Sequence, residues 1–160
     1  TAMGTFSNCS GGITPWNTIL TCEENYDHAY GEVTIDSNGK RNINRTFRDQ
    51  KWLEHYNNPP EHYGWVVEFN PKTKTAKKLT SMGRFFHESA TVVTSKDGTP
   101  VVYSGDDRVG EHLYKFISNS KTNLEKGELF AADLKNKTWI SLDINKQPKL
   151  KALFKNQTYK

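Results

Sequence analysis

Cysteines and long apolar runs are both scarce in this chain of 160 residues. Only two cysteines occur, Cys9 and Cys22, so one disulfide is possible but a disulfide framework is excluded. No apolar run is long enough to cross a membrane as a helix. No signal peptide opens the sequence, because Thr1 leads almost directly into Gly4 and Phe6. The length of the chain is that of one ordinary domain, or of a piece of a larger one.

Helical patterns are missing as well. Apolar residues make up 34% of the chain, below the usual share for a globular domain, while aromatic residues reach 12%. Many aromatic side chains favour half-buried strands over amphipathic helices, and no helical pattern extends beyond two turns. The composition therefore predicts an all-β protein with a thin, flat core.

The net charge is +4 and the pI about 9.0. Lysines gather at 72–78, at 135–137 and at the C-terminus. A nucleic-acid surface would instead interleave arginines and aromatic residues on one face. We therefore interpret the lysine clusters as solvated hairpin tips and expect no nucleic-acid partner.

Short strand signals follow one another closely and are separated by tight turns. Asn70-Pro71 and Asp97-Gly98 are strong turn signals, the second typical of a hairpin. The predicted strands cover residues 18–22, 65–69, 75–79, 90–94, 100–104, 113–117, 129–132 and 138–142. The pattern predicts antiparallel strands throughout.

These strands form an internal repeat. Unit one covers residues 4–80 and unit two residues 83–143, and their lead residues Cys9 and Glu88 are 79 positions apart (88 − 9). Four strands per unit is the pattern of a propeller blade, and closed propellers have about four to eight blades. We expect an antiparallel β-propeller fragment of about two four-stranded blades, with 144–160 beginning a missing segment. The remaining blades of a longer chain would be its partners.

The two units differ mainly by an insertion at residues 26–62. This stretch is polar and contains the turn signals Ser37-Asn38-Gly39-Lys40 and Asn57-Asn58-Pro59-Pro60. We expect a long surface excursion, with a short helix near 49–56.

The two lead residues could carry chemistry. The residue before the innermost strand of a blade lies at the mouth of the propeller channel, so Cys9 and Glu88 are expected to converge there. A thiolate and a carboxylate together suit a transition metal. His87 is a possible second ligand or an orienting partner. Gly11 and Gly12 would let backbone and metal come close.

Acidic pairs follow equivalent strands in the two units. Glu23-Glu24 and Asp106-Asp107 offer paired hard oxygens, which suit calcium. Taken singly, such pairs are most often solvated turns, and a buried cysteine such as Cys22 is usually a small apolar residue. The recurrence of one layout in both units favours a metal site.

Longer motifs resemble a known family. They are the stretch from Gly4 to Asn25, Tyr63-Gly64-Trp65-Val66-Val67-Glu68, Gly83-Arg84-Phe85-Phe86-His87-Glu88-Ser89-Ala90, Tyr103-Ser104-Gly105-Asp106-Asp107 and Gly110-Glu111-His112-Leu113-Tyr114-Lys115-Phe116. Together they resemble the PhoX-type alkaline phosphatases over residues 4 to 134.

The resemblance implies an exported, periplasmic or secreted β-propeller that hydrolyses small phosphate esters with iron and calcium. Cys9 then looks like the iron-binding thiolate and Glu88 like an iron-binding carboxylate, and these two would be the catalytic pair. The motif leaves Cys22 as an alternative ligand, and the position before a strand favours Cys9. The calcium ligands would be Glu23, Glu24, Asp106 and Asp107.

Two family blocks are absent from this sequence. An Arg-Pro-Glu block that adds a carboxylate and a phosphate-facing arginine is missing, as is an upstream Asn-His-Glu block, and neither Arg84 nor Arg108 matches the former. We therefore expect an active full-length phosphatase and a nearly inactive isolated fragment. Two alternatives stay open: a calcium-dependent lactonase-type propeller, which needs no thiolate, and a non-catalytic propeller whose calcium stabilises a binding surface.

Overall fold

The computed structural model describes residues 4–45 and 52–154, and these ranges fold mainly into strands. In chain order the strands are β1 (Asn8–Ile13), β2 (Ile19–Glu23), β3 (Glu32–Ile35), β4 (Arg41–Asn44), β5 (Val66–Asn70), β6 (Thr75–Lys78), β7 (Thr91–Thr94), β8 (Pro100–Gly105), β9 (Leu113–Ser118), β10 (Gly127–Asp133) and β11 (Thr138–Ser141). The short helices are α1 (Asp27–Tyr30), α2 (Trp52–His55) and α3 (Pro148–Phe154), with 3-10 turns η1 (Pro60–His62) and η2 (Thr80–Met82). None of the helices in these ranges is long and apolar enough to span a bilayer.

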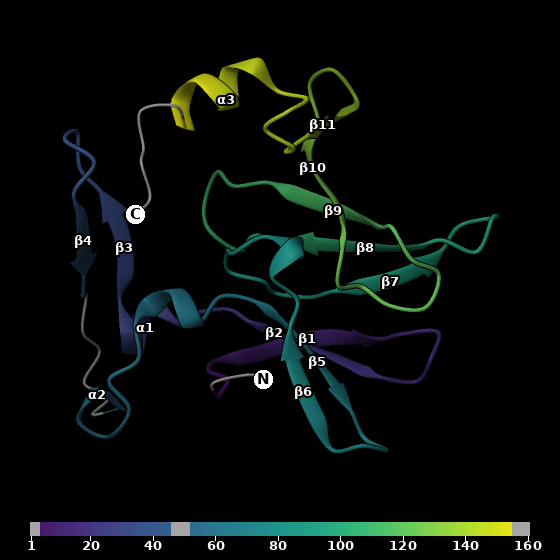
Figure 1. Ribbon diagram of the computed structural model, residues 1–160, viewed down its shortest axis with the longest axis horizontal. Coiled ribbons are helices and arrows are strands. Elements are labelled where there is room, and N and C mark those ends of the chain that lie inside the picture. The colour runs from purple at the N-terminus through teal and green to yellow at the C-terminus, as the bar shows by residue number, and fades with distance from the viewer. Residues whose placement is uncertain (1–3, 46–51, 155–160) are drawn as a thin grey trace.

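Two antiparallel sheets correspond to the two predicted units (Figure 1). Sheet one has the order β1-β2-β5-β6, and sheet two has the order β11-β10-β9-β8-β7. The expected all-β, antiparallel class is confirmed, and the stacked sheets have the arrangement expected of neighbouring blades. Sheet two has one strand more than the four or so expected per blade, and this fifth strand, β11, lies within the strand predicted at residues 138–142. Lys137, at φ 54°, sits in a turn that folds the chain back, so that Trp139 of β11 pairs with Ala132 as part of a fifth strand.

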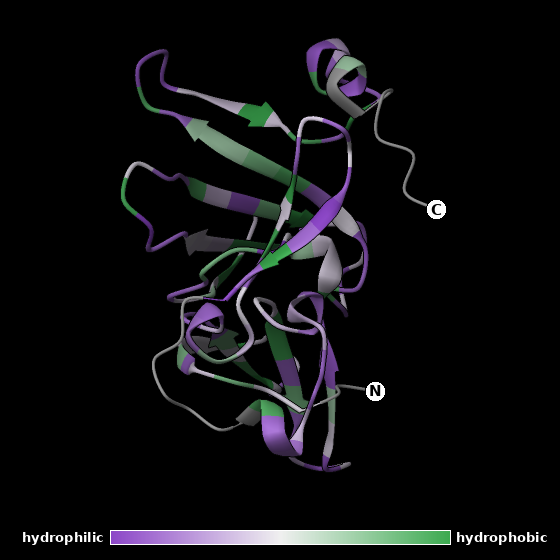
Figure 2. Ribbon diagram, turned by 90° about the vertical axis from the view of Figure 1, so that its left-hand side faces the viewer, coloured by the Kyte–Doolittle hydropathy of each residue, from purple (hydrophilic) through white to green (hydrophobic). Residues whose placement is uncertain are grey.

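The main core lies between the two sheets. Leu20, Cys22 and Val66 of sheet one pack in one cluster with Val102 and Phe116 of sheet two. Apolar residues, green in Figure 2, lie mainly on the strands, and the connecting loops are mostly hydrophilic. Burying these side chains supplies the main driving force for stacking the sheets.

Cys22 belongs to this core and is completely buried. Burial raises the pKa of its thiol to about 12, so the group stays protonated and behaves as a small apolar side chain. Both cysteines are free thiols, and Cys9 is exposed.

The insertion is more than a polar surface excursion. Its hairpin, β3 paired with β4, stands apart from the sheets at the left of Figure 1. The segment around α1 also forms a second core of buried Tyr26, Ala29, Tyr30 and Tyr63. The expected short helix is present as α2, and residues 49–51 of that prediction lie outside the described ranges.

One arginine ties the insertion to unit two. Arg84 donates hydrogen bonds to Glu32 Oε1 at 2.7 Å, to the Tyr63 carbonyl at 2.7 Å and to the Pro60 carbonyl at 3.0 Å. Its guanidinium also lies 4.5 Å from the centre of the Tyr26 ring. With its donors used in this way, Arg84 serves the fold rather than a ligand.

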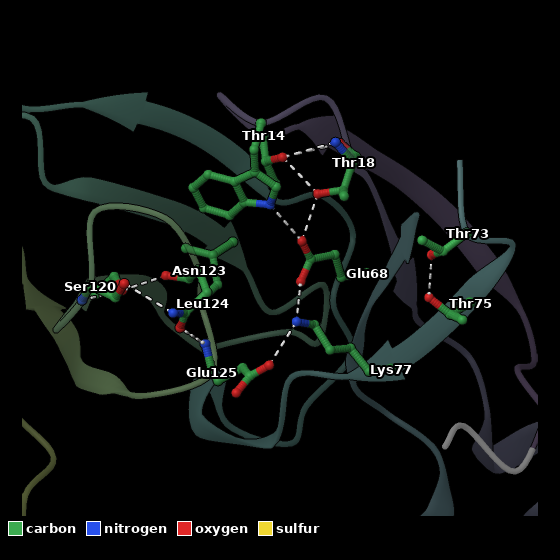
Figure 3. A network of polar contacts seen from close by, with 12 residues as sticks. Thr14, Thr18, Glu68, Thr73, Thr75, Lys77, Ser120, Asn123, Leu124 and Glu125 are labelled. Carbon is green, nitrogen blue, oxygen red and sulfur yellow. Dashed lines mark hydrogen bonds and ion pairs between the residues drawn. The ribbon is translucent and has the colours of Figure 1, made fainter. Parts of the chain in front are cut away.

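The buried carboxylate of Glu68 takes part in a second set of contacts between sheet one and unit two (Figure 3). Glu68, 4% exposed, accepts hydrogen bonds from Trp16 Nε1 at 2.8 Å and from Thr18 Oγ1 at 2.6 Å. Its second oxygen lies 3.2 Å from Lys77 Nζ, which is also 2.8 Å from Glu125 of unit two. This chain of contacts runs from sheet one into the loop before β10.

Candidate metal centre

Four of the six predicted ligands come from matching positions in the two sheets. Cys9 lies near the start of β1 and Glu24 directly after β2, while Glu88 precedes β7 and Asp107 follows β8. Since neighbouring antiparallel strands begin and end at the same edge, all four belong to one edge of the stacked sheets. We call Cys9, Glu24, Glu88 and Asp107 the rim group.

Backbone hydrogen bonds hold the rim group together. Within each unit, Glu24 N donates to Ser7 O at 3.2 Å and Glu88 N to Gly105 O at 3.4 Å. Between the units, His87 N donates to Glu23 O at 3.2 Å. This bond joins the end of β2 to the segment before β7, so residues about 60 to 80 positions apart meet at the rim.

Cys9 lies inside strand β1 rather than before it, which corrects the sequence interpretation. Asn8 pairs with Glu23 and Gly11 with Thr21, so one extra residue is accommodated between them. Such a β-bulge re-aims the side chains of the bulged strand and is common beside active sites. The bulge accounts for an exposed Cys9 in a strand of the packed sheet.

The Cys9 thiol faces carboxylates. A backbone hydrogen bond from Ser10 lowers its pKa, but a side-chain hydrogen bond with Glu24, some desolvation, and the charges of Glu24 and Glu88 outweigh that effect and raise it. The negative charges next to the sulfur therefore come from both units.

Glu88 and Asp107 form the second pair. Their hydrogen bond, followed by the charge of Asp107, some desolvation and the charge of Glu24, raises the pKa of Glu88. Carboxylates that crowd one another in this way resist ionising together. The main causes of the raised pKa values of Cys9 and Glu88 include no cationic side chain.

The first residue of each acidic pair, Glu23 or Asp106, is buried in the protein and does not belong to the rim group. Glu23 is fully buried, and its carboxylate accepts hydrogen bonds from Phe6 N and Trp65 N, both at 3.1 Å, and from Lys78 Nζ at 2.8 Å. Because its oxygens are occupied by these donors, we leave Glu23 out of the proposed ligand set.

Asp106 repeats this arrangement in unit two. Its side chain is buried, and Arg108 forms a two-pronged contact with it, at 3.0 Å to Oδ1 and 2.6 Å to Oδ2. The carboxylate is neutralised within the fold, so we also leave Asp106 out. The Arg108 guanidinium lies 4.9 Å from the centre of the Phe86 ring and is oriented by both contacts.

His87 is a structural residue in this arrangement. It is fully buried, its Nδ1 lies 2.9 Å from Ser104 Oγ, and its Nε2 lies 3.0 Å from the Gly83 carbonyl. Burial lowers its pKa to about 4, which keeps the ring neutral at physiological pH. With both nitrogens engaged in contacts within the fold, the ring does not offer a metal ligand.

The glycines beside Cys9 serve strand packing. A Cβ on Gly11 would lie 1.8 Å from the Leu20 carbonyl oxygen, and one on Gly12 would lie 2.2 Å from that of Ala90. Gly12 therefore allows β1 to approach the segment entering β7 in unit two. The sequence interpretation placed a metal, rather than these backbone atoms, against the glycines.

The rim group fits a metal by its chemistry. In the described residues no three His, Cys, Asp or Glu side chains already enclose an ion; the donors stand as two pairs. A thiol and three carboxylates in two neighbouring pairs are the donors expected for a soft transition metal next to a hard cation.

Comparison with known proteins assigns a family to this arrangement. The profile described as "Alkaline phosphatase PhoX" matches residues 1–159. The chain belongs to the PhoX alkaline phosphatase family. Among solved structures it is similar to Pseudomonas fluorescens PhoX in complex with vanadate, a transition-state analogue, with 35% identity and a TM-score of 0.69. The match covers 87% of this chain, and no curated protein matches it.

The predicted PhoX membership is thus confirmed. The match covers 30% of the solved PhoX chain, so these two sheets correspond to a minor part of that protein. Sequence reasoning did not separate the rim residues of each acidic pair from the buried ones. Along β8 the two-residue alternation of buried side chains, continued past Ser104, marks Asp106 as the buried one; along β2 this alternation fails, because Cys22 and Glu23 are both buried.

Proposed function

We propose that the longer protein to which these sheets belong hydrolyses phosphate monoesters at a metal cluster held partly by the rim group. Cys9 and Glu88 would hold iron, and Glu24 and Asp107 would hold calcium. The observation that carries the proposal is that the Cys9–Glu24 pair of unit one and the Glu88–Asp107 pair of unit two lie close enough for charges of each to raise a pKa in the other. Family membership supplies the reaction class.

Bound metals would clamp the phosphate oxygens and neutralise the charge that develops in the transition state. The residues of this chain provide the frame. The backbone bond from His87 to Glu23 holds the two units in register, and the bulge presents the Cys9 side chain at the rim. Glu23 and Asp106 keep the neighbouring cations Lys78 and Arg108 occupied within the fold.

The substrates would be small phosphate esters, and the location would be the periplasm or the outside of the cell, as for the family the sequence resembles. The two sheets supply only part of the cluster, so the isolated chain should be nearly inactive. Phosphatase activity of the isolated chain at the rate of the full-length protein would overturn this part of the proposal.

The decisive experiment measures metal content and phosphatase activity in the full-length protein and in Cys9→Ala and Glu88→Gln. We expect each substitution to remove bound iron and to lower kcat/KM by more than about 100-fold, the upper end of losses seen when only a supporting residue of a metal site is changed. Cys22→Ala and Glu54→Gln are matched controls, since Cys22 lies in the core and Glu54 on exposed α2.

The alternatives predict other results. A calcium-dependent lactonase-type propeller would contain calcium without iron and would tolerate Cys9→Ala. A non-catalytic propeller would bind metal in the wild-type protein and hydrolyse no phosphate ester. Wild-type rates in both rim variants would refute the proposed site.

A further inference from the structure

An aromatic pocket of about 490 Å³ borders the segment that leads into β1, and it has no role in the site described so far. Four aromatic residues line it, Phe6, Tyr30, Tyr56 and Tyr63, together with Asn58 and the residues just before Phe6. Its volume lies within the range of small-molecule sites, about 300 to 1,000 Å³.

Most of the pocket wall is fixed by packing. The rings of Tyr30 and Tyr63 stack with centroids 3.9 Å apart, and Phe6 meets Tyr30 edge-on at 5.6 Å. Asn58 Nδ2 donates a hydrogen bond of 2.9 Å to the Tyr63 hydroxyl. Tyr56 is the most exposed of the four aromatic residues, with 56% of its surface open to solvent.

The same backbone segment joins the pocket to the rim group. Phe6 N donates to the Glu23 carboxylate at 3.1 Å, and Ser7 O accepts a hydrogen bond of 3.2 Å from Glu24 N. Cys9 follows Phe6 by three residues, which span at most about 10 Å of extended chain. This short separation is the basis for considering the pocket and the rim group together as parts of one substrate site.

The chemistry of the lining decides which part of a substrate enters. None of the described residues that line the pocket carries a charged side chain, and Lys78, whose Nζ atom lies 4.5 Å from the centre of the Tyr63 ring, is paired with Glu23. Aromatic walls instead favour a planar, apolar ring system, which they contact by stacking or edge-on packing. Phosphate at the metals and a ring in the pocket would then be the two ends of one ester.

We propose that this pocket binds the alcohol part of the substrate and selects phosphate monoesters whose alcohol carries a planar aromatic ring. The inference rests on the proposed phosphatase function for its catalytic consequence, but ring binding does not depend on catalysis. The two can therefore be tested separately.

The first measurement is binding of 2-naphthol, which carries the ring and no phosphate, to the full-length protein by fluorescence titration. Loss of the Tyr56 contact in Tyr56→Ala should weaken binding about 2- to 12-fold, the range for one aromatic contact, while Tyr56→Phe keeps it. Tyr103→Ala is the matched control, because Tyr103 lies on β8 of sheet two. Unfolding temperatures verify that each variant is folded.

The second measurement compares kcat/KM for 2-naphthyl phosphate and for glycerol 2-phosphate. Tyr56→Ala should lower the first by a similar 2- to 12-fold, mainly through KM, and leave the second unchanged. Equal losses for both esters, or no 2-naphthol binding by the wild-type protein, would overturn the inference. Naphthol binding that depends on Tyr56 in a protein without phosphatase activity would support the pocket and refute the proposed function.

Discussion

Lys78 places its Nζ atom 2.8 Å and 3.0 Å from the two carboxylate oxygens of Glu23. The side chains are 10% and 0% exposed, so this ion pair lies inside the protein, directly behind the rim group. The Lys78 nitrogen also lies 4.5 Å from the centre of the Tyr63 ring, which connects the pair to the core of the insertion.

Breaking this pair should destabilise the fold strongly. Lys78→Met leaves the buried Glu23 carboxylate without its cation, and such a loss typically costs about 3 to 5 kcal/mol. Denaturant unfolding of the full-length protein measures the change. Lys72→Met in the exposed turn before β6 is the control, expected within about 0.5 kcal/mol of wild type. A loss below about 1 kcal/mol for Lys78→Met would mean that solvent or another group neutralises Glu23.

Glu24 and Glu23 should respond in opposite ways to the same substitution. Glu24→Gln removes a negative charge from a crowded group, so the metal-free protein should keep or gain stability while metal binding weakens. Glu23→Gln disturbs a buried ion pair and should lower stability. Asp107→Asn and Asp106→Asn should repeat the contrast in unit two. Unfolding temperature in chelator, measured beside metal content, separates the two effects.

A metal-free protein that is destabilised equally by Glu24→Gln and Glu23→Gln would contradict this assignment. So would loss of metal from the Glu23 variant alone. Either result would return the first residue of each pair to the ligand set.

The sequence predicted the family, the all-β class and which segments meet, because strand signals and long motifs are local. It could not decide which of two adjacent carboxylates reaches the rim. For Glu23-Glu24 the alternation of buried side chains breaks at the end of β2, where Cys22 and Glu23 are both buried, and the facing strand β1 carries the bulge at Cys9. The cations that pair with the buried carboxylates, Lys78 with Glu23 and Arg108 with Asp106, also cannot be identified from the acidic pairs themselves.

The second core was missed for a related reason. Tyr26 and Tyr30 are spaced by four, which places them on one face of a helical turn, but they sit in a stretch with polar composition. Their partner Tyr63 is distant in the sequence. Glu68 likewise stood out as one charge in an apolar strand, while its partners Trp16 and Lys77 are on other segments.

Glu68 should make stability depend on pH in the acid range. Burial alone would raise the pKa of its carboxyl, but hydrogen bonds from Thr18 and Trp16 and the charge of Lys77 outweigh burial and lower it. A lowered folded-state pKa contributes stability above the unfolded-state value and loses it as pH falls through the folded-state value. The stability difference between wild type and Glu68→Gln should thus be constant above about pH 5 and shrink below it.

The size of that difference should be about 2 kcal/mol at neutral pH, typical of hydrogen bonds to a charged group. Glu125→Gln serves as the control, since Glu125 is 60% exposed and its ion pair with Lys77 should contribute at most about 1 kcal/mol. A difference that grows as pH falls would show that burial, and not hydrogen bonding, dominates at Glu68.

Substitution of Gly12 tests whether close packing of the two sheets positions the rim group. A Cβ there would lie 2.2 Å from the Ala90 carbonyl oxygen, so Gly12→Ala must push β1 away from the segment entering β7. Overpacking of this kind costs about 1 to 3 kcal/mol. Because Cys9 precedes Gly12 on β1 and Glu88 precedes Ala90, the shift should also separate Cys9 from Glu88.

We therefore expect Gly12→Ala to lower both unfolding temperature and iron content in the full-length protein. Gly105→Ala is the matched control at the same edge, since a Cβ on Gly105 would meet nothing within 4 Å. If Gly12→Ala lost stability but kept its iron and activity, the metal site would not depend on the contact between the sheets. Cys9 and Glu88 would then bind metal independently, which would contradict a site shared by the two units.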